Sequence, residues 1–154
     1  MRRSARASAA LLLAALAACT RQRATPDLTL TAAPRATLDV EADAARAVVA
    51  AFVAAEAEAD PGADTLLASD ATFVAGGISV TVRPRLAALN GPGTALLEAV
   101  STHVAGPVTW VVAVYRFEAR TPALSDRGRL TVVLEKQRAG WRIRHVHSSS
   151  VERW

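Results

Sequence analysis

The chain has 154 residues and a formal net charge of +4 at pH 7. This length suits one domain with a substantial core and is too short for two comfortable domains. Three arginines near the start, Arg2, Arg3 and Arg6, account for most of the charge, since 15 basic and 14 acidic residues remain without them. No run of Lys and Arg is interleaved with aromatic residues, which argues against nucleic-acid binding.

Residues 1–19 have the pattern of a targeting segment. A charged start precedes an apolar stretch at 7–18, which is too short to cross a bilayer as a stop-transfer helix. The stretch ends with Leu-Ala-Ala-Cys at 16–19, which resembles the signal of bacterial lipoproteins, where the chain is cut before a cysteine that is then lipidated. This resemblance implies a protein held on a membrane of the cell envelope by lipid on Cys19, facing the periplasm or the exterior. An ordinary secretory signal is the alternative.

The chain after this leader divides into a linker and one domain. Residues 20–37 are rich in Thr, Ala and Pro, which predicts a flexible tether between the membrane and the domain. The domain is expected to span 38–154. Cys19 is the only cysteine in the chain, so no intrachain disulfide can stabilise the domain.

The strongest helix prediction covers residues 38–60. Asp39 can cap this helix, and Pro61-Gly62 ends it. Hydrophobic residues at helical spacing form an apolar stripe, and we expect Phe52 within it to pack against a sheet. The stripe comprises Val48, Val49, Phe52 and Val53. A short second helix is predicted at 65–68.

The rest of the domain is rich in β-branched and aromatic residues, which predict strands. Short strands at 71–75 and 78–82 flank a turn at Gly76-Gly77, and a helical turn is expected at 84–89. A loop at 122–127 separates the last two long strands from those before it. Residues 94–104 favour a strand, although their first half also suits a helix. The prediction is therefore of four long antiparallel strands, at 94–104, 108–119, 128–138 and 141–150.

The last predicted strand carries the clearest functional clue. Alternate side chains of a strand point to opposite faces, so Trp141, Ile143, His145 and His147 are expected to share one face. Two imidazoles beside two apolar anchors can line a pocket and exchange protons near neutral pH. The alternative for each histidine is a structural role, with its ring bonded to a partner inside the sheet.

The order of the elements and the last strand together resemble the SnoaL-like branch of the nuclear transport factor 2-like superfamily. The sequence Gly-Trp-Arg-Ile-Arg-His-Val-His-Ser-Ser at 140–149 is similar to the family's last strand, and 70–74 is similar to the segment after its first helices. The resemblance covers 38–151 and implies an α+β fold in which a curved antiparallel sheet wraps around N-terminal helices as a cone. The superfamily includes isomerases, cyclases, dehydratases and non-catalytic binders, and it often dimerises, so the resemblance does not select a function.

A cone of this kind leaves a concave mouth that suits a small ligand. His147 is the predicted acid/base, and His145, Arg116 and Trp141 are further candidates for ligand binding, with a core position as the alternative for Trp141. Arg116 can clamp a carboxylate if it faces the cone, or pair with Glu118 if it faces outward. No third ligand accompanies the two histidines, so neither a metal nor a cofactor is expected.

The related isomerases and cyclases use an acidic base deep in the cone, and no inward carboxylate is evident in this sequence. Glu98 and Glu118 are the mid-strand options, and neither is convincing. The favoured function is therefore a non-catalytic, lipid-anchored envelope protein that binds a small molecule or forms a homodimer. The first alternative is an isomerase, cyclase or dehydratase that uses His147 for proton transfer on a carbonyl-containing or polycyclic substrate. The second alternative is a structural dimerisation module.

Overall fold

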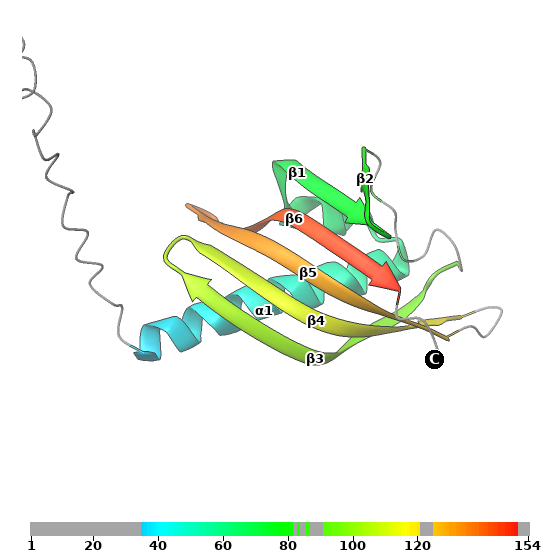
Figure 1. The fold of residues 1–154 in the computed structure, drawn as a ribbon, viewed down its shortest axis with the longest axis horizontal. Coiled ribbons are helices and arrows are strands. Elements are labelled where there is room, and N and C mark those ends of the chain that lie inside the picture. Colours follow the sequence, from blue (N-terminus) through cyan, green and yellow to red (C-terminus); the bar gives the residue numbers. More distant parts are fainter. Residues whose placement is uncertain (1–34, 82, 84–85, 87–90, 121–124, 151–154) are drawn as a thin grey trace, which may run out of the picture. The chain divides into compact units, whose positions relative to one another are not determined.

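The computed structural model of the chain describes residues 35–81, 83, 86, 91–120 and 125–150. The predicted leader with Cys19, nearly all of the predicted linker and most of the helical turn predicted at 84–89 lie outside these residues. Within them, one α-helix and a short 3₁₀ helix precede six strands, which form a single curved sheet that stays open (Figure 1). The predicted α+β class is confirmed.

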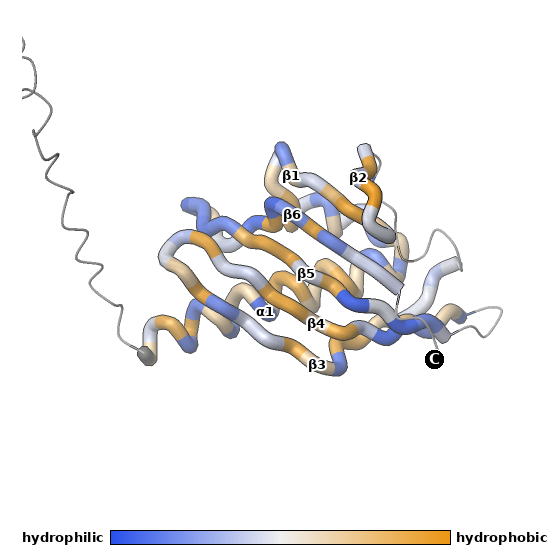
Figure 2. The backbone as a smooth tube through the Cα atoms, viewed as in Figure 1, coloured by the Kyte–Doolittle hydropathy of each residue, from blue (hydrophilic) through white to orange (hydrophobic). Residues whose placement is uncertain are grey.

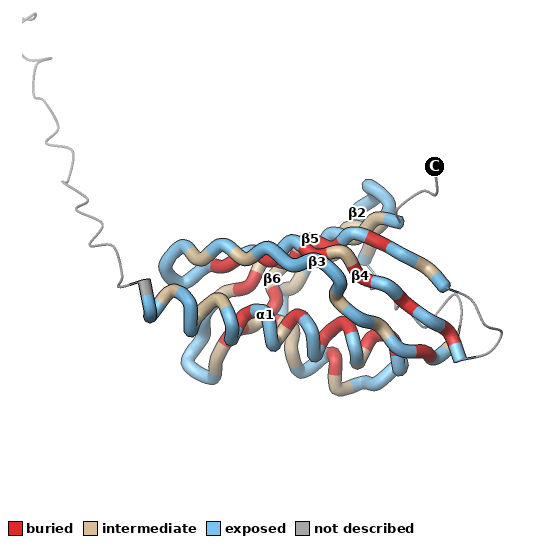
Figure 3. The backbone as a smooth tube through the Cα atoms, turned by 90° about the horizontal axis from the view of Figure 1, so that it is seen from below, coloured by how far each residue is buried: buried red, intermediate tan, exposed pale blue. Residues whose placement is uncertain are grey.

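Helix α1 (Arg35–Glu58) lies along one face of the sheet (Figure 3). It begins before its predicted start because residues 35–37 contain no Gly or Pro that would stop it, and Asp39 therefore lies inside the helix instead of at its cap. The predicted packing of Phe52 is confirmed, since this residue is 4% exposed within the core. The buried side of the helix extends the predicted stripe and consists of Ala45, Val49, Phe52, Val53, Glu56 and Ala57.

A 3₁₀ helix, η1 (Pro61–Leu66), stands in place of the short helix predicted at 65–68. Asp60 caps it by accepting a hydrogen bond of 2.7 Å from the amide of Gly62. Pro61 suits the first position, where its missing N–H is not needed. The turn therefore closes earlier than predicted, and β1 (Leu67–Ala75) begins before the predicted strand.

The other strands form the sheet in the order β2-β1-β6-β5-β4-β3. They are β2 (Ile78–Val80), β3 (Gly93–Ala105), β4 (Val108–Ala119), β5 (Ser125–Gln137) and β6 (Gly140–Ser150). The predicted hairpin at Gly76-Gly77 and the four long antiparallel strands are confirmed. In addition, β1 pairs with β6 in parallel, an arrangement that the local sequence pattern did not indicate.

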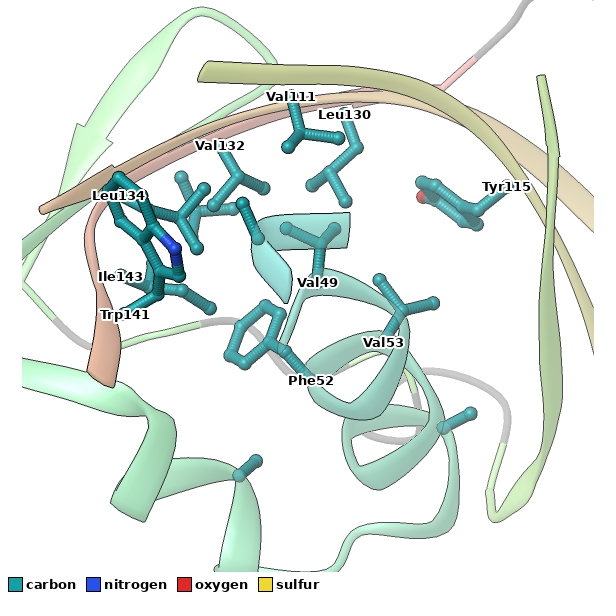
Figure 4. Close-up of a cluster of buried hydrophobic side chains, with 14 of the residues drawn as sticks. Val49, Phe52, Val53, Val111, Tyr115, Leu130, Val132, Leu134, Trp141 and Ile143 are labelled. Carbon is teal, nitrogen blue, oxygen red and sulfur yellow. The ribbon is translucent and has the colours of Figure 1, made fainter. Parts of the chain in front are cut away.

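The sheet has an inner face, which contacts α1, and an outer face on the opposite side. Residues of β4 alternate between these faces, and hydrophobic residues follow most of this strand (Figure 2). Inner-face side chains of β4, β5 and β6 meet the buried side of α1 (Figure 4). This shared layer is the hydrophobic core, which includes Val49, Phe52, Val53, Val111, Tyr115, Leu130, Val132, Leu134, Trp141 and Ile143.

One register shift interrupts the alternation along β6. Leu134 of β5 pairs with Ile143, but Val133 pairs with His145, so Arg144 is an extra residue on β6. Such an extra residue is a β-bulge, and it moves every later side chain of the strand to the opposite face.

The predicted shared face on the last strand is therefore wrong. Trp141 and Ile143 are buried on the inner face, whereas His145 and His147 lie on the outer face. The bulge places Val146, instead of an imidazole, against the core. A valine is easier to bury than an imidazole, because it has no polar group that must find a hydrogen-bond partner.

Candidate functional site

A small cavity lies between the C-terminal half of α1 and the inner face of the sheet. Its volume is about 40 Å³, which is room for roughly three water molecules. Figure 4 shows side chains of α1, β4 and β5 directed into the space between helix and sheet. Most of the cavity wall is apolar and comes from Phe52, Val53, Phe73, Val74, Leu86, Leu130 and Val146. The polar lining residues are Glu56, Arg83, Tyr115 and Ser148.

Glu56, near the end of α1, places a carboxylate in this wall. The residue is 3% exposed, and a buried carboxylate requires a partner. Its Oε1 atom lies 2.8 Å from Nη2 of Arg83. The same Nη2 lies 2.6 Å from Oδ1 of Asp64, whose side chain is largely exposed. The cavity therefore contains a buried ion pair, and the second acid lies toward solvent.

Arg83 follows β2 and reaches across the aromatic part of the wall. The centre of its guanidinium lies 5.7 Å from the ring centroid of Phe52 and 5.9 Å from that of Phe73. Aromatic rings attract cations placed over their faces. Within the described residues, the buried Nε–H of Arg83 has no hydrogen-bond partner. Buried donors are rarely left in this condition, so the N–H is a candidate contact for a ligand acceptor atom.

Tyr115 brings a hydroxyl to the cavity from the inner face of β4. Burial raises the pKa of this hydroxyl, and the negative charge of Asp126 raises it further. The group therefore remains protonated, and able to donate a hydrogen bond, at neutral pH. Gly128 is its partner across β5, and a Cβ atom there would overlap the Tyr115 ring. The ring of Tyr115 can therefore occupy this position only because Gly128 has no side chain.

Comparison with known protein families shows to which family the chain belongs. The family model described as the SnoaL-like domain matches residues 45–152. The chain belongs to the SnoaL-like family. A search of curated proteins found no match to this SnoaL-like chain.

Solved structures share the fold of this SnoaL-like domain at low sequence identity. A proposed dehydratase of the NTF2-like family from Streptomyces avermitilis has a TM-score of 0.65 and 18% identity, over 75% of this chain and 99% of that one. A proposed ketosteroid isomerase from Shewanella frigidimarina has a TM-score of 0.55 and 24% identity, over 69% and 94%. The CamKII hub homology domain of Chlamydomonas reinhardtii has a TM-score of 0.58 and 17% identity, over 72% and 98%. These similarities show the NTF2-like α+β fold.

The two histidines predicted as site residues do not reach the cavity of the SnoaL-like domain. His147 is exposed on the outer face, opposite Thr131 of β5. His145, on the same face, lies with its Nδ1 atom 2.9 Å from Oγ1 of Thr72. The bulge, which the predicted strand did not include, accounts for both positions.

The other two predicted ligand contacts are also outside the cavity of the SnoaL-like domain. Arg116 faces outward, and its Nε lies 3.6 Å from Glu98 and 3.5 Å from Glu118. Trp141 is buried on the inner face, as its core alternative predicted, and its Nε1–H donates a hydrogen bond of 3.0 Å to Glu41. Glu41 and the cavity residue Glu56 are both on α1, about 22 Å apart at the rise of a helix.

The expectation that no carboxylate points inward is wrong, because Glu56 does so from the helix. A signal for it was present in the sequence. Glu56 follows Phe52 by four residues and Val53 by three, which places all three on one side of α1. Arg83 had no comparable signal, since its position depends on the path of the chain after β2.

Two further findings concern membranes and metals. Among the residues that the structure describes, no helix is long and apolar enough to cross a membrane. In the same part of the SnoaL-like chain, no group of three or more His, Cys, Asp or Glu side chains is placed to hold a metal ion.

Proposed function

We propose that this SnoaL-like domain binds a small, neutral, mostly apolar molecule with a hydrogen-bond acceptor in the cavity between α1 and the sheet. The observation that carries the proposal is the buried Glu56–Arg83 pair in an otherwise apolar wall. Small-molecule sites usually combine apolar walls with a few convergent polar groups. A buried ion pair contributes little net stability, because desolvating two charges offsets their attraction. Its presence here therefore favours a role in recognition.

The polar groups define the chemistry of this ligand. Because Glu56 already neutralises Arg83, a ligand carboxylate would bring a second negative charge next to Glu56. The Nε–H of Arg83 and the hydroxyl of Tyr115 can instead donate to a neutral acceptor, such as a carbonyl or ether oxygen. The cavity of about 40 Å³ suits a compound of few heavy atoms, and a larger one requires side chains to move.

Thermal unfolding of the full chain with a library of small carbonyl, ether and carboxylate compounds tests this proposal. Neutral compounds that bind should raise the melting temperature with the logarithm of their concentration. Ser148→Leu fills part of the cavity and should abolish the shift, whereas His147→Ala, on the outer face, should leave it unchanged. Stabilisation by carboxylates alone would contradict the assigned chemistry. A shift that survives Ser148→Leu would contradict the assigned place.

A second candidate is proton-transfer catalysis on a small carbonyl compound, with Glu56 as the base in place of His147. The presence of a carboxylate and a tyrosine hydroxyl in one cavity supports this candidate, as do the isomerase and dehydratase assignments of two similar structures. Glu56 would take a proton from the carbon next to the carbonyl, while Tyr115 would donate to the oxygen that gains charge.

Glu56→Gln separates the binding function from the catalytic one. If the domain is an enzyme, this variant should bind the compound but no longer exchange its acidic C–H proton with deuterium from solvent. If the domain only binds, neither the parent nor the variant should catalyse the exchange. Exchange that continues unchanged in Glu56→Gln would exclude Glu56 as the base.

The proposed function includes attachment to a membrane of the cell envelope through lipid on Cys19, with the domain facing the periplasm or the exterior. The apolar run ending in Leu-Ala-Ala-Cys at 16–19 supports it. Mass spectrometry of the envelope fraction should find Cys19 as a lipid-modified N-terminal residue, and Cys19→Ser should release the protein from the membrane. A mature form that lacks Cys19 and is free in solution would overturn this part of the proposal.

A further inference from the structure

Strand β3 forms one edge of the sheet (Figure 1). Its residues pair with β4 on one side, and within the described part of the chain no strand pairs with its other side. Alternate residues of an edge strand direct their N–H and C=O groups away from the sheet, where these groups can pair with another extended chain. The strand at the opposite edge, β2, has three residues, whereas β3 has 13. The sheet therefore offers one long edge to which a further strand can be added.

The edge formed by β3 lacks most of the features that protect edge strands from further pairing. Natural edge strands are commonly protected by lysine, by proline or by a bulge. The sequence of β3 contains no lysine, arginine or proline. One register shift makes Glu98 an extra residue, but residues 99–105 beyond it pair regularly with β4. This segment, which we call the open edge, includes no permanently charged side chain and is therefore available for strand addition.

A groove on the outer face of the sheet borders the open edge. Its volume is about 380 Å³. The side next to the edge is lined by the small residues Ala99 and Ser101, which pair with Val114 and Val112 of β4. Because the two residues at the edge are small, a longer side chain on an added strand can pass over them and reach the valines. The groove therefore offers a place in which an apolar side chain of that strand can be buried.

Arg129 of β5 gives this groove a positive charge. Arg127, two residues earlier, has its Nη2 atom 2.7 Å from Oε2 of Glu98, but exposed Arg129 has no acidic partner among the described residues. Arginine binds carboxylates well, because its planar guanidinium matches their geometry. Arg129 lies in the same cross-strand row as Ala99. A carboxylate on an added strand in this row would start about 14 Å away, three strand spacings, and a glutamate and an arginine extended toward each other can bridge that distance.

We propose that the open edge binds an extended, acidic segment of a partner protein, which joins the sheet as a further strand beside β3. Main-chain hydrogen bonds to the edge provide the affinity, and the groove selects the side chains. An acidic side chain of the segment points toward Arg129, and a large apolar side chain lies over Val112. These two residues are two positions apart in the segment, because alternate residues of a strand share one face.

The charge in the groove favours a different chain over a second copy of β3 as the added strand. β3 contains one acidic residue, Glu98, and the carboxylate of this residue is already paired with Arg127. Two open edges paired with each other would therefore leave Arg129 of both copies without a carboxylate. A free carboxylate compound could reach Arg129, but it would leave the main-chain groups of the open edge unpaired. An acidic extended segment satisfies both the arginine and the edge.

A synthetic peptide of alternating threonine and valine, with a glutamate and a leucine two positions apart, tests the proposal. Fluorescence anisotropy with the full chain in a mild detergent should show binding that Arg129→Glu weakens about fivefold. Exchange of the peptide's glutamate for lysine should restore binding to Arg129→Glu. Arg138→Glu, in the exposed turn after β5, is the matched control and should bind as the parent does. All three proteins should melt at the same temperature, because both arginines are exposed. No binding to the parent, or equal affinity of the parent for the two peptides, would overturn the proposal.

Methylation of the peptide backbone distinguishes strand addition from contact through side chains alone. Alternate amides of an added strand face β3, so methylation of one alternate set should abolish binding, whereas methylation of the other set should not. The bound peptide should also slow amide hydrogen exchange at residues 99–105 but not in β2. Equal effects of the two methylated sets would overturn the proposal, as would protection of the open edge by a second copy in the absence of peptide. The inference is independent of the cavity, since Ser148→Leu should retain peptide binding.

Discussion

Removal of the Glu56 carboxylate tests the electrostatics of the cavity. The side chain of Arg83 is 10% exposed, and in Glu56→Leu its remaining acidic partner is Asp64, whose side chain is 57% exposed. Loss of one member of a buried ion pair typically costs about 3–5 kcal/mol. Because Asp64 still offers Arg83 a solvated partner, we expect the lower end of this range, about 3 kcal/mol. Asp64→Asn removes only that solvated partner and should cost less than about 1 kcal/mol.

The double variant Glu56→Leu with Arg83→Met completes the experiment. It replaces the ion pair with hydrophobic side chains of similar length, and it should recover most of the stability that Glu56→Leu alone loses. Urea unfolding of the parent and the variants, with unchanged m-values, measures these free energies. A cost below about 1 kcal/mol for Glu56→Leu would refute the reasoning. The reasoning would also be refuted if the free-energy changes of Glu56→Leu alone and Arg83→Met alone summed to that of the double variant, because residues in a shared ion pair must couple.

Three further substitutions examine the rest of the domain. Phe52→Ala should lower the unfolding free energy by about 3–5 kcal/mol in urea, and an unchanged midpoint would mean that α1 packs differently. Gly128→Ala forces a Cβ atom against Tyr115 and should destabilise by about 1–3 kcal/mol; an unaffected melting temperature would disprove the close packing. The hydrogen bond from Lys136 lowers the pKa of Glu41 in the folded protein. The ionised carboxylate therefore stabilises the fold at pH values above the pKa that Glu41 has in the unfolded chain. This stabilisation is lost as the pH falls through the lower pKa of the folded state. As the pH is lowered, the unfolding free energy of Glu41→Gln should therefore fall less steeply than that of the parent. Parallel pH profiles for the two proteins would argue against the contact between Lys136 and Glu41.

The helix and the long strands were predictable because their signals are local. The apolar stripe of α1 reflects contacts between neighbouring turns and the core, and it is visible in any window of the sequence. The alternation in β4 is equally regular. The start of β1 was missed because it depends on where η1 closes, and η1, capped by Asp60, begins at Pro61, before the helix predicted at 65–68.

The candidate site was much less predictable, because it depends on contacts between distant segments. The faces of His145 and His147 depend on whether β6 pairs regularly with β5 or accommodates Arg144 as an extra residue, and both pairings are compatible with the local pattern. Arg83 reaches Glu56 only through the tertiary path of the chain. Glu56 itself could have been found, since a glutamate within an apolar helical stripe is an exception that requires an explanation.

The bulge at Arg144 also decides which side chains of β6 reach the cavity. The residues of β6 could line the cavity in either of two ways without any amino-acid substitution. In the observed register, Val146 and Ser148 contact the cavity. A regular register of the same length would present His145 and His147 instead. A cavity lined by Val146 and Ser148 and one equipped with imidazoles for proton transfer are therefore separated only by whether β6 accommodates Arg144 as an extra residue or pairs regularly with β5.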